Sequence, residues 1–472
     1  MLAQFTELLV SIDNIVWGVP LIVLIMGTGI FLTIRLGVLQ FRHLGTALKF
    51  MVKNEADGIG EVTSFGALCT AMAATVGTGN IVGVATAVVA GGPGALFWMV
   101  LAACFGMATK YSEGLLAVKF RRVDADSHSL GGPFYYIEKG MGSKWKWLAR
   151  IFASFGIGAG LLGIGTITQV NGISSAVQNF FDPKNTNTVH LFGSDYSWAI
   201  VITALVVAAL TALVIIGGLK RIANVASFIV PFMAIIYVII CVTILIFNIT
   251  AIPAAIVEIF ASAFGLRAMA GGALGALMLS MQKGVARGIF SNEAGLGSAP
   301  IAAAAAQTKE PARQGLISMT GTFIDTIIIC NLTGFAIMVT GSWNIGLNGA
   351  AVTANAFSTG IPWAPEVGSF LLMVCLALFA FTTILGWDYY SERCLEYLVG
   401  RNKPVLLTYK WLYILAVLIG PFLTLSAVWT LADIFNGLMA IPNLIALLAL
   451  NGVIVAETRD YFKRLNDNII KL

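Results

Sequence analysis

A tetrapeptide of small and polar residues, Gly77-Thr78-Gly79-Asn80, interrupts a long apolar stretch that carries no charged side chain. Two glycines around a hydroxyl weaken a helix, because glycine costs ~1 kcal/mol relative to alanine in a helix interior. An opened turn would leave the N–H groups of Thr78 and Gly79 free to bind a carboxylate. The preceding carbonyls of Ala73 and Val76 would be free to ligate a hard cation. The expected chemistry is therefore non-covalent binding of a carboxylate and a cation.

Two adjacent hydroxyl residues, Thr382 and Thr383, lie near the midpoint of another uncharged stretch. Their oxygens suit a hard cation such as sodium. Trp387 follows Thr383 by four residues, so both side chains share one helix face and Trp387 would form a wall beside the ligand. Two alternatives remain open: each threonine bonds a carbonyl of its own preceding turn, or Trp387 anchors the helix at the membrane interface.

Three further polar side chains are expected at membrane depth. Asn80 either bonds the ligand or braces the weak turn, and Gln169 either contacts the ligand or joins two helices by a hydrogen bond. Asp325 is more informative, because a carboxylate inside a membrane costs ~3 kcal/mol. It either stabilises a cation or pairs with Lys283, and Gln282 beside Lys283 completes this candidate charge or gating group.

The composition is that of an integral membrane protein. Of 472 residues, 58% are hydrophobic and 11% are charged, and the mean hydropathy is +0.89. The six cysteines include no CxxC pair and the three histidines lie in separate loops, so no metal cluster is expected. The sequence contains neither an HExxH metalloenzyme motif nor a G-x-x-x-x-G-K-[ST] nucleotide-binding motif. We therefore expect neither an enzyme nor a nucleotide-driven pump, and neither a cofactor nor a nucleic acid partner.

Apolar stretches long enough to cross a bilayer predict an all-α protein with eleven transmembrane helices. They lie near residues 13–35, 64–90, 94–118, 148–178, 197–217, 223–248, 267–291, 314–341, 366–391, 406–430 and 434–455. A shorter stretch over 251–266 predicts an amphipathic helix at the membrane surface. Of the 28 Lys and Arg residues, all but Lys184 and Arg267 fall at one end of these helices, which predicts an outer N-terminus and a cytoplasmic C-terminus.

A second glycine-rich span, from Gly271 to Gly284, lies in the seventh predicted helix. Without the first helix, the two interrupted helices are the first and the sixth of ten. Matching interruptions in two halves are typical of inverted-repeat transporters, whose ligand binds at the breaks; the alternative is that the glycines allow close helix packing. The predicted organisation is one peripheral N-terminal helix (1–36), two five-helix repeats (60–250 and 265–456) and a cytoplasmic tail (457–472).

Three motifs carry a resemblance to a known family over nearly the whole chain. They are Gly91-Gly92-Pro93-Gly94-Ala95-Leu96-Phe97-Trp98-Met99, the Ala-Thr-Val-Gly-Thr-Gly-Asn segment at 74–80, and Phe290-Ser291-Asn292-Glu293-Ala294-Gly295-Leu296-Gly297-Ser298-Ala299-Pro300. With these the chain resembles the alanine or glycine:cation symporters, also called sodium:alanine symporters. Val100 departs from the tryptophan usual in that family, and Met281-Gln282-Lys283 replaces bulkier apolar residues in a helix expected to line the pocket.

The resemblance implies the leucine-transporter fold of the amino acid-polyamine-cation superfamily, with a five-plus-five inverted repeat and two broken helices. It also implies sodium- or proton-coupled uptake of small neutral amino acids across the cell membrane of a prokaryote, and of these we expect sodium-coupled uptake of alanine or glycine. The amino-acid pocket implied by the resemblance comprises Thr78, Gly79, Asn80, Gln169, Thr383 and Trp387. The implied sodium site comprises Ala73, Val76, Phe379, Thr382 and Thr383.

Several functional alternatives stay open at this point. The coupling ion could be a proton instead of sodium, and the preferred substrate could be glutamine. An amino-acid sensor or a channel with the same core belongs to another functional class. The expected partners are the amino acid, the coupling ion and the lipid bilayer, and the sequence leaves the oligomeric state open.

Overall fold

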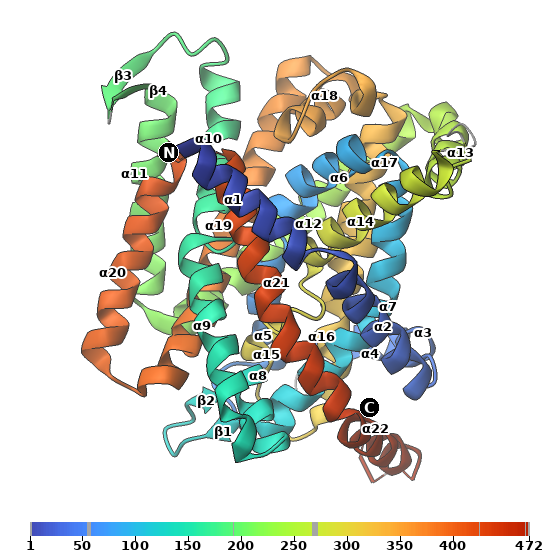
Figure 1. Cartoon of the computed structure of the whole chain (residues 1–472), viewed down its shortest axis with the longest axis vertical. Coiled ribbons are helices and arrows are strands. Elements are labelled where there is room, and N and C mark those ends of the chain that lie inside the picture. Colours follow the sequence, from blue (N-terminus) through green and yellow to red (C-terminus); the bar gives the residue numbers. More distant parts are fainter. Residues whose placement is uncertain are drawn as a thin grey trace.

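The computed structural model describes residues 2–53, 58–191, 193–266, 272–423, 425–467 and 469–470 as a bundle of helices (Figure 1). Four helices open the chain: α1 (Leu2–Val16), α2 (Val19–Arg35), α3 (Leu39–Arg42) and α4 (Leu44–Val52). The first half of the bundle contains α5 (Ser64–Thr75), the π-helix η1 (Gly79–Gly83), α6 (Val84–Gly91), α7 (Gly94–Phe120), α9 (Lys146–Leu162), α10 (Ile167–Phe181), α11 (Trp198–Ile215) and α12 (Gly218–Phe247).

The second half of the bundle follows a short connecting helix. It contains α14 (Ala273–Asn292), α15 (Ala299–Ala303), α16 (Pro311–Thr322), the π-helix η5 (Phe323–Cys330), α17 (Asn331–Val339), η6 (Ser342–Asn344), α18 (Ala350–Gly360), α19 (Pro365–Val399), α20 (Lys403–Ile419), η7 (Gly420–Phe422), α21 (Leu425–Ala449) and α22 (Asn451–Asn466).

Short elements connect the long helices at the two ends of the bundle. They are β1 (Arg122–Val123), β2 (Ser129–Leu130), α8 (Pro133–Tyr135), η2 (Tyr136–Gly140), η3 (Ser143–Trp145), β3 (Thr188–Leu191), β4 (Ser194–Ser197), η4 (Ile249–Ala251) and α13 (Ile252–Ala263). The two antiparallel hairpins, β1–β2 and β3–β4, lie at opposite ends of the bundle (Figure 1). Helix α13 occupies the stretch predicted to form a short amphipathic helix.

Nine helices in the described part of the chain are long and apolar enough to cross a membrane, or ten if α5 and α6 count as one bent span. The remaining predicted span, near 267–291, overlaps α14, a 20-residue helix that carries Lys283 and Arg287. Large apolar side chains such as Phe228 on α12 (76% exposed) and Trp411 on α20 (55% exposed) cover the outside of the bundle. This distribution fits contact with lipid, and the total of eleven spans stays a prediction.

The position of the second helix interruption differs from the prediction. Helix α14 is continuous from Ala273 to Asn292, and the chain opens after it, over residues 293–298, before α15 begins. Within α14, a Cβ added to Gly284 would lie 2.2 Å from the carbonyl oxygen of Ala95 on α7. Close helix packing, the alternative reading, therefore explains Gly284, while Gly271 lies outside the described residues.

The opened segment at 293–298 is stable because its amides have a charged partner. Glu113 on α7 accepts hydrogen bonds through Oε1 from the N–H groups of Gly295 (3.1 Å) and Gly297 (3.2 Å). The side-chain amide of Asn443 on α21 donates to the same oxygen at 2.6 Å. Buried amides outside a helix need such partners, and this carboxylate supplies them.

The two interrupted helices meet in the interior. Helix α14 contacts η1, and α15 contacts α5. Helix α7 packs against both α14 and α16, while α19 packs against α5, α9 and α10. The ends created by the interruptions therefore lie next to α19, which carries the threonine pair.

Candidate functional site

The first helix interruption falls where the sequence predicts it. Helix α5 ends at Thr75, Val76 is extended (φ −79°, ψ 91°), and the chain resumes in η1 at Gly79 with a bend of 51°. Glycine is required at position 77 because α19 approaches closely: an added Cβ would lie 2.4 Å from Thr383 Oγ1 and 3.0 Å from Gln169 Oε1.

Side chains from η1, α10 and α19 satisfy the polar groups of this interruption. The Gly77 N–H donates to Asn80 Oδ1 (2.8 Å), and the Thr78 N–H donates to Gln169 Oε1 (3.1 Å). The Thr383 hydroxyl donates to the Val76 carbonyl at 3.3 Å. The interruption thus gathers four of the residues predicted for the amino-acid pocket, and all of them are buried.

Three of the predicted cation ligands, Ala73, Val76 and Thr383, lie at this interruption, while the Thr382 hydroxyl lies 3.6 Å from Met233 Sδ on α12. In a continuous helix the Gly77 N–H would pair with the Ala73 carbonyl, but it donates to Asn80 instead. The Thr382 and Thr383 hydroxyls both donate to the Phe379 carbonyl, at 2.9 and 3.0 Å. The alternative of bonding within the helix therefore holds for both threonines, while Thr383 additionally reaches Val76.

Trp387 lies inside the protein, so its alternative reading as an interfacial anchor is wrong. Its side chain is fully buried, and its Nε1 donates to Glu293 Oε1 at 2.8 Å. Glu293 has a left-handed backbone (φ 57°), and its other carboxylate oxygen accepts from the Ser298 hydroxyl at 2.6 Å. Glu293 connects the second interruption to α19. The sequence contains one signal for this role, because Glu293 is the carboxylate inside the Phe290–Pro300 motif, but the sequence alone does not identify its partners.

Asp325 binds three neutral donors at the start of η5. Asn80 Nδ2 donates to its Oδ1 at 2.7 Å, and the hydroxyls of Ser291 (2.9 Å) and Thr326 (2.7 Å) donate to its Oδ2. The carboxylate is completely buried. It therefore lies directly beside the first interruption, bonded to a residue of the predicted pocket.

The described residues do not show the alternative in which Asp325 pairs with Lys283. Lys283 packs its stem against Gly91 of α6, and Gln282 donates to the Trp17 carbonyl (3.4 Å) near the N-terminal helices. Both side chains project from α14 away from the interruptions, because α14 continues through the region where a break was expected. A charge or gating role for Lys283 and Gln282 stays a prediction, and these contacts do not support it.

A further interruption separates α9 from α10 at residues 163–166, inside a stretch predicted to be one helix. Close approach explains its glycines, since a Cβ at Gly165 would lie 2.6 Å from Trp387 Cβ. The Tyr413 hydroxyl contacts the carbonyls of Gly165 (2.9 Å) and Ile384 (2.8 Å). Gln169 lies just after this interruption, and its Nε2 donates to the Ile164 carbonyl at 3.0 Å.

We expect Tyr413→Phe to lower the free energy of unfolding by ~1–3 kcal/mol, because a buried carbonyl then loses its donor. Tyr390→Phe is the matched control, since the buried Tyr390 hydroxyl has no hydrogen-bond partner within the described residues. Thermal unfolding of the purified variants measures the difference, and equal melting temperatures would contradict the proposed bridging role of Tyr413.

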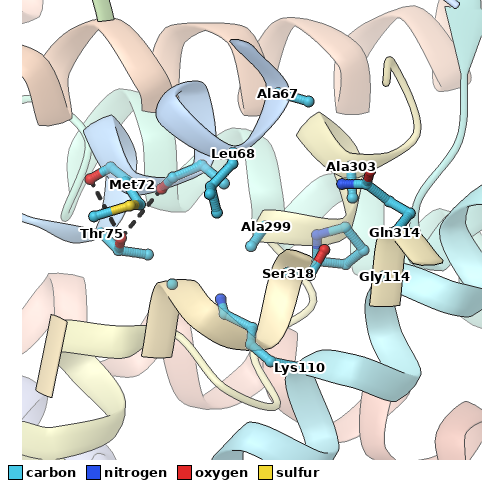
Figure 2. A pocket seen from close by; sticks show the side chains of 13 residues that line it. Ala67, Leu68, Met72, Thr75, Lys110, Gly114, Ala299, Ala303, Gln314 and Ser318 are labelled. Atoms are coloured by element: carbon cyan, nitrogen blue, oxygen red, sulfur yellow. Dashed lines mark hydrogen bonds between the residues drawn. The ribbon is translucent and has the colours of Figure 1, made fainter. Parts of the chain in front are cut away.

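A small cavity of about 20 Å³ lies beside the last turns of α5, with α7, α15 and α16 as its other walls (Figure 2). Its polar lining residues are Thr75, Lys110, Gln314 and Ser318. Figure 2 shows the Lys110 side chain extending from α7 toward this cavity. Lys110 is only 3% exposed, and its Nζ has no hydrogen-bond partner within the described residues.

Lys110 is the positive group near three buried carboxylates. Its charge is attracted by Glu113, Glu293 and Asp325. Each of these carboxylates already accepts hydrogen bonds from neutral donors, an arrangement that suits the ionised form. Lys110 forms no ion pair with these carboxylates within the described residues, so Asp325 beside the first interruption is bonded by neutral donors and has no direct cationic partner.

The chain matches the model of the sodium:alanine symporter family over residues 2–471. An uncharacterized transporter of Haemophilus influenzae is 54% identical over 464 residues, covering 98% of this chain and 97% of the relative. The sodium/alanine symporter AgcS of Methanococcus maripaludis is 45% identical, covering 97% of each chain. The probable sodium/glutamine symporter GlnT of Bacillus subtilis is 37% identical, covering 98% of this chain and 92% of the relative.

The fold is also similar to that of a solved transporter. The crystal structure of MhsT in complex with L-phenylalanine superposes with a TM-score of 0.58 at 14% identity, covering 85% of this chain and 92% of MhsT. This similarity shows a leucine-transporter fold and leaves the ligand of this chain open. The family match over almost every residue decides the assignment: the chain belongs to the sodium:alanine symporter family, whose members are multi-pass membrane transporters of an amino acid with a cation, and not enzymes.

Proposed function

We propose that the protein carries a small neutral amino acid, alanine or glycine, into the cell together with sodium by alternating access. The observation that carries this proposal is the interruption between Thr75 and Gly79, where backbone amides and carbonyls meet side chains of α10 and α19. Broken helices of this kind bind carboxylates with their amides and sodium with their carbonyls. The name of the relative AgcS supports alanine and sodium.

The amino-acid carboxylate would bind at the Thr78 and Gly79 amides. Gln169 Oε1 accepts from the Thr78 N–H, so an arriving carboxylate would take over this donor. The Gln169 side chain would then be free to bond the substrate. Trp387, held by Glu293, would limit the size of the substrate side chain.

Sodium would bind to oxygens of Ala73, Val76, Phe379, Thr382 and Thr383. The Ala73 carbonyl does not receive the Gly77 N–H, which donates to Asn80 instead. Both threonine hydroxyls donate to the same carbonyl, that of Phe379 on α19. Asp325 adds negative charge beside the interruption and would favour the cation without pairing to Lys283. A membrane potential that is negative inside the cell then adds ~2.3 kcal/mol to the driving force for uptake, per positive charge carried inward and for each 100 mV.

Uptake into proteoliposomes tests this function. We expect labelled alanine to accumulate inside the vesicles when an inward sodium gradient is imposed. When the sodium concentration is equal on both sides, alanine should reach the same concentration inside and outside without accumulating. Equal accumulation under both conditions would contradict sodium coupling and favour protons. Counterflow distinguishes a carrier from a sensor, which binds amino acid without exchanging it, and single-channel currents would indicate a channel.

Competition by unlabelled amino acids tests the substrate. Alanine or glycine should inhibit labelled alanine uptake more strongly than glutamine does. Glutamine is the second candidate because the relative GlnT is named a probable sodium/glutamine symporter. The eleven-helix topology, with an outer N-terminus and a cytoplasmic C-terminus, is part of the proposal and can be checked by labelling single cysteines placed in the loops.

We expect Thr383→Val to raise the sodium concentration for half-maximal uptake by about 10-fold, because the change removes one oxygen at the proposed cation site. A factor of ten corresponds to about 1.4 kcal/mol, within the range for a lost polar contact. Sodium titrations of uptake, normalised to the amount of folded protein, measure this shift. A purely structural role would instead reduce folded protein while leaving the sodium dependence of the remainder unchanged.

A further inference from the structure

A groove with an unusual combination of side chains lies between α3 and α22, at the end of the bundle where α22 projects (Figure 1). Its volume is about 610 Å³. We call it the basic groove and define it by its cations Arg42, Arg459 and Lys463 and its apolar residues Leu36, Leu39 and Phe462. Helix α2, which is part of a spanning segment, ends at Arg35 just before the groove begins.

The three cations of the basic groove are unpaired in the part of the chain that the structure describes. All three are exposed. Their neighbour Arg464 differs, because it forms a two-point ion pair with Glu310 (2.7 and 2.7 Å) and a third bond with Asp460. The positive charge of Arg464 is therefore balanced, whereas that of the groove is balanced only in part, by Asp467 at its edge.

Two stacked rings form part of the lining of the groove. The rings of His43 and Phe462 stack with centroids 4.1 Å apart. Burial and the neighbouring Arg42 guanidinium lower the pKa of His43, so this ring is neutral at physiological pH. Val38, which directly precedes α3, is 43% exposed, and Phe41 on α3 is 54% exposed. These apolar surfaces fit contact with lipid.

From this juxtaposition we propose that the basic groove binds one anionic phospholipid, with its phosphate among Arg42, Arg459 and Lys463 and its acyl chains along the partly exposed Leu36 and Phe462. Unpaired cations beside apolar side chains, at the end of a spanning helix, match the phosphate, glycerol and first methylenes of a phospholipid. A soluble anion would not need the apolar wall. The lining side chains carry three positive charges against one negative, so the ligand must be anionic.

The test uses the full-length, delipidated protein in detergent and measures binding of phosphatidylglycerol and of phosphatidylcholine with identical chains by native mass spectrometry. Each basic side chain near a phosphate contributes roughly a five-fold gain in affinity, so the triple variant Arg42→Gln, Arg459→Gln and Lys463→Gln should bind phosphatidylglycerol roughly 100-fold more weakly. The control variant Lys49→Gln, Lys144→Gln and Arg150→Gln removes the same charge elsewhere and should bind like the unmodified protein.

A gain-of-binding variant guards against loss of fold. Asp467→Asn removes the one negative side chain of the groove and should tighten phosphatidylglycerol binding by roughly five-fold, a result that unfolding cannot produce. Three results would overturn the proposal: equal binding of phosphatidylglycerol by the triple variant and the unmodified protein, no preference for it over phosphatidylcholine, or no gain with Asp467→Asn.

Discussion

We expect Gly77→Val to abolish sodium-driven alanine uptake while the protein still inserts and folds. Even a single added carbon at this position would lie 2.4 Å from Thr383 Oγ1 and 3.0 Å from Gln169 Oε1. Both oxygens belong to the proposed site, so valine would push them away from the interruption and break the bonds to Val76 and Thr78. Initial uptake rates in proteoliposomes should fall at least 100-fold.

Gly83→Ala is the matched control for this variant. Gly83 ends η1, one turn beyond the interruption, and an added Cβ there meets no heavy atom within 4 Å. This variant should retain most of the uptake. If Gly77→Val transports alanine at a normal rate, the contact between α5 and α19 in the structure is not part of the transport cycle.

The second large effect is expected for Lys110→Met. This change removes the positive charge near Glu113, Glu293 and Asp325 and leaves three buried carboxylates without it. Breaking a buried ion pair costs about 3–5 kcal/mol, but Lys110 forms no direct ion pair within the described residues, so we expect a smaller loss of about 1–2 kcal/mol from the longer-range attraction. The yield of folded protein and its melting temperature should therefore both fall.

The double variant Lys110→Met with Glu293→Gln tests the electrostatic cause. Glutamine keeps an oxygen to accept from Trp387 but removes one negative charge, so part of the lost stability should return. Lys184→Met, at an exposed loop position, is the control and should behave like the unmodified protein. Unchanged stability of Lys110→Met would contradict the view that this lysine balances the buried carboxylates.

The first interruption could be located from sequence because its causes are local. Two glycines flank Thr78 within a stretch that has no charged residue. The local sequence alone therefore predicts an unstable helical turn at membrane depth. The structure places the break between Thr75 and Gly79, as the spacing predicts.

The other two interruptions could not be located in the same way, because their partners are distant in sequence. The segment at 293–298 is held by Glu113, and the turn at 163–166 contacts Tyr413. The glycine content of the Gly271–Gly284 span predicted an interruption there, but glycine is needed at Gly284 because the Ala95 backbone on α7 approaches it closely. The sequence predicted that Asp325 lies at membrane depth, but it did not predict that Asn80 and Ser291 are its hydrogen-bond partners.

The hydrogen bonds at the two main interruptions differ in kind, and this difference has a mechanical consequence. The segment at 293–298 is fastened to α7 and α21 by a single carboxylate, Glu113, and charge-assisted hydrogen bonds are roughly twice as strong as neutral ones. At the turn after Thr75, neutral amide and hydroxyl groups bond the backbone directly, and the carboxylate of Asp325 acts only through the side chain of Asn80. The turn after Thr75 therefore resists bending less than the segment at 293–298, so a ligand bound at the proposed site would act on the more flexible of the two interruptions.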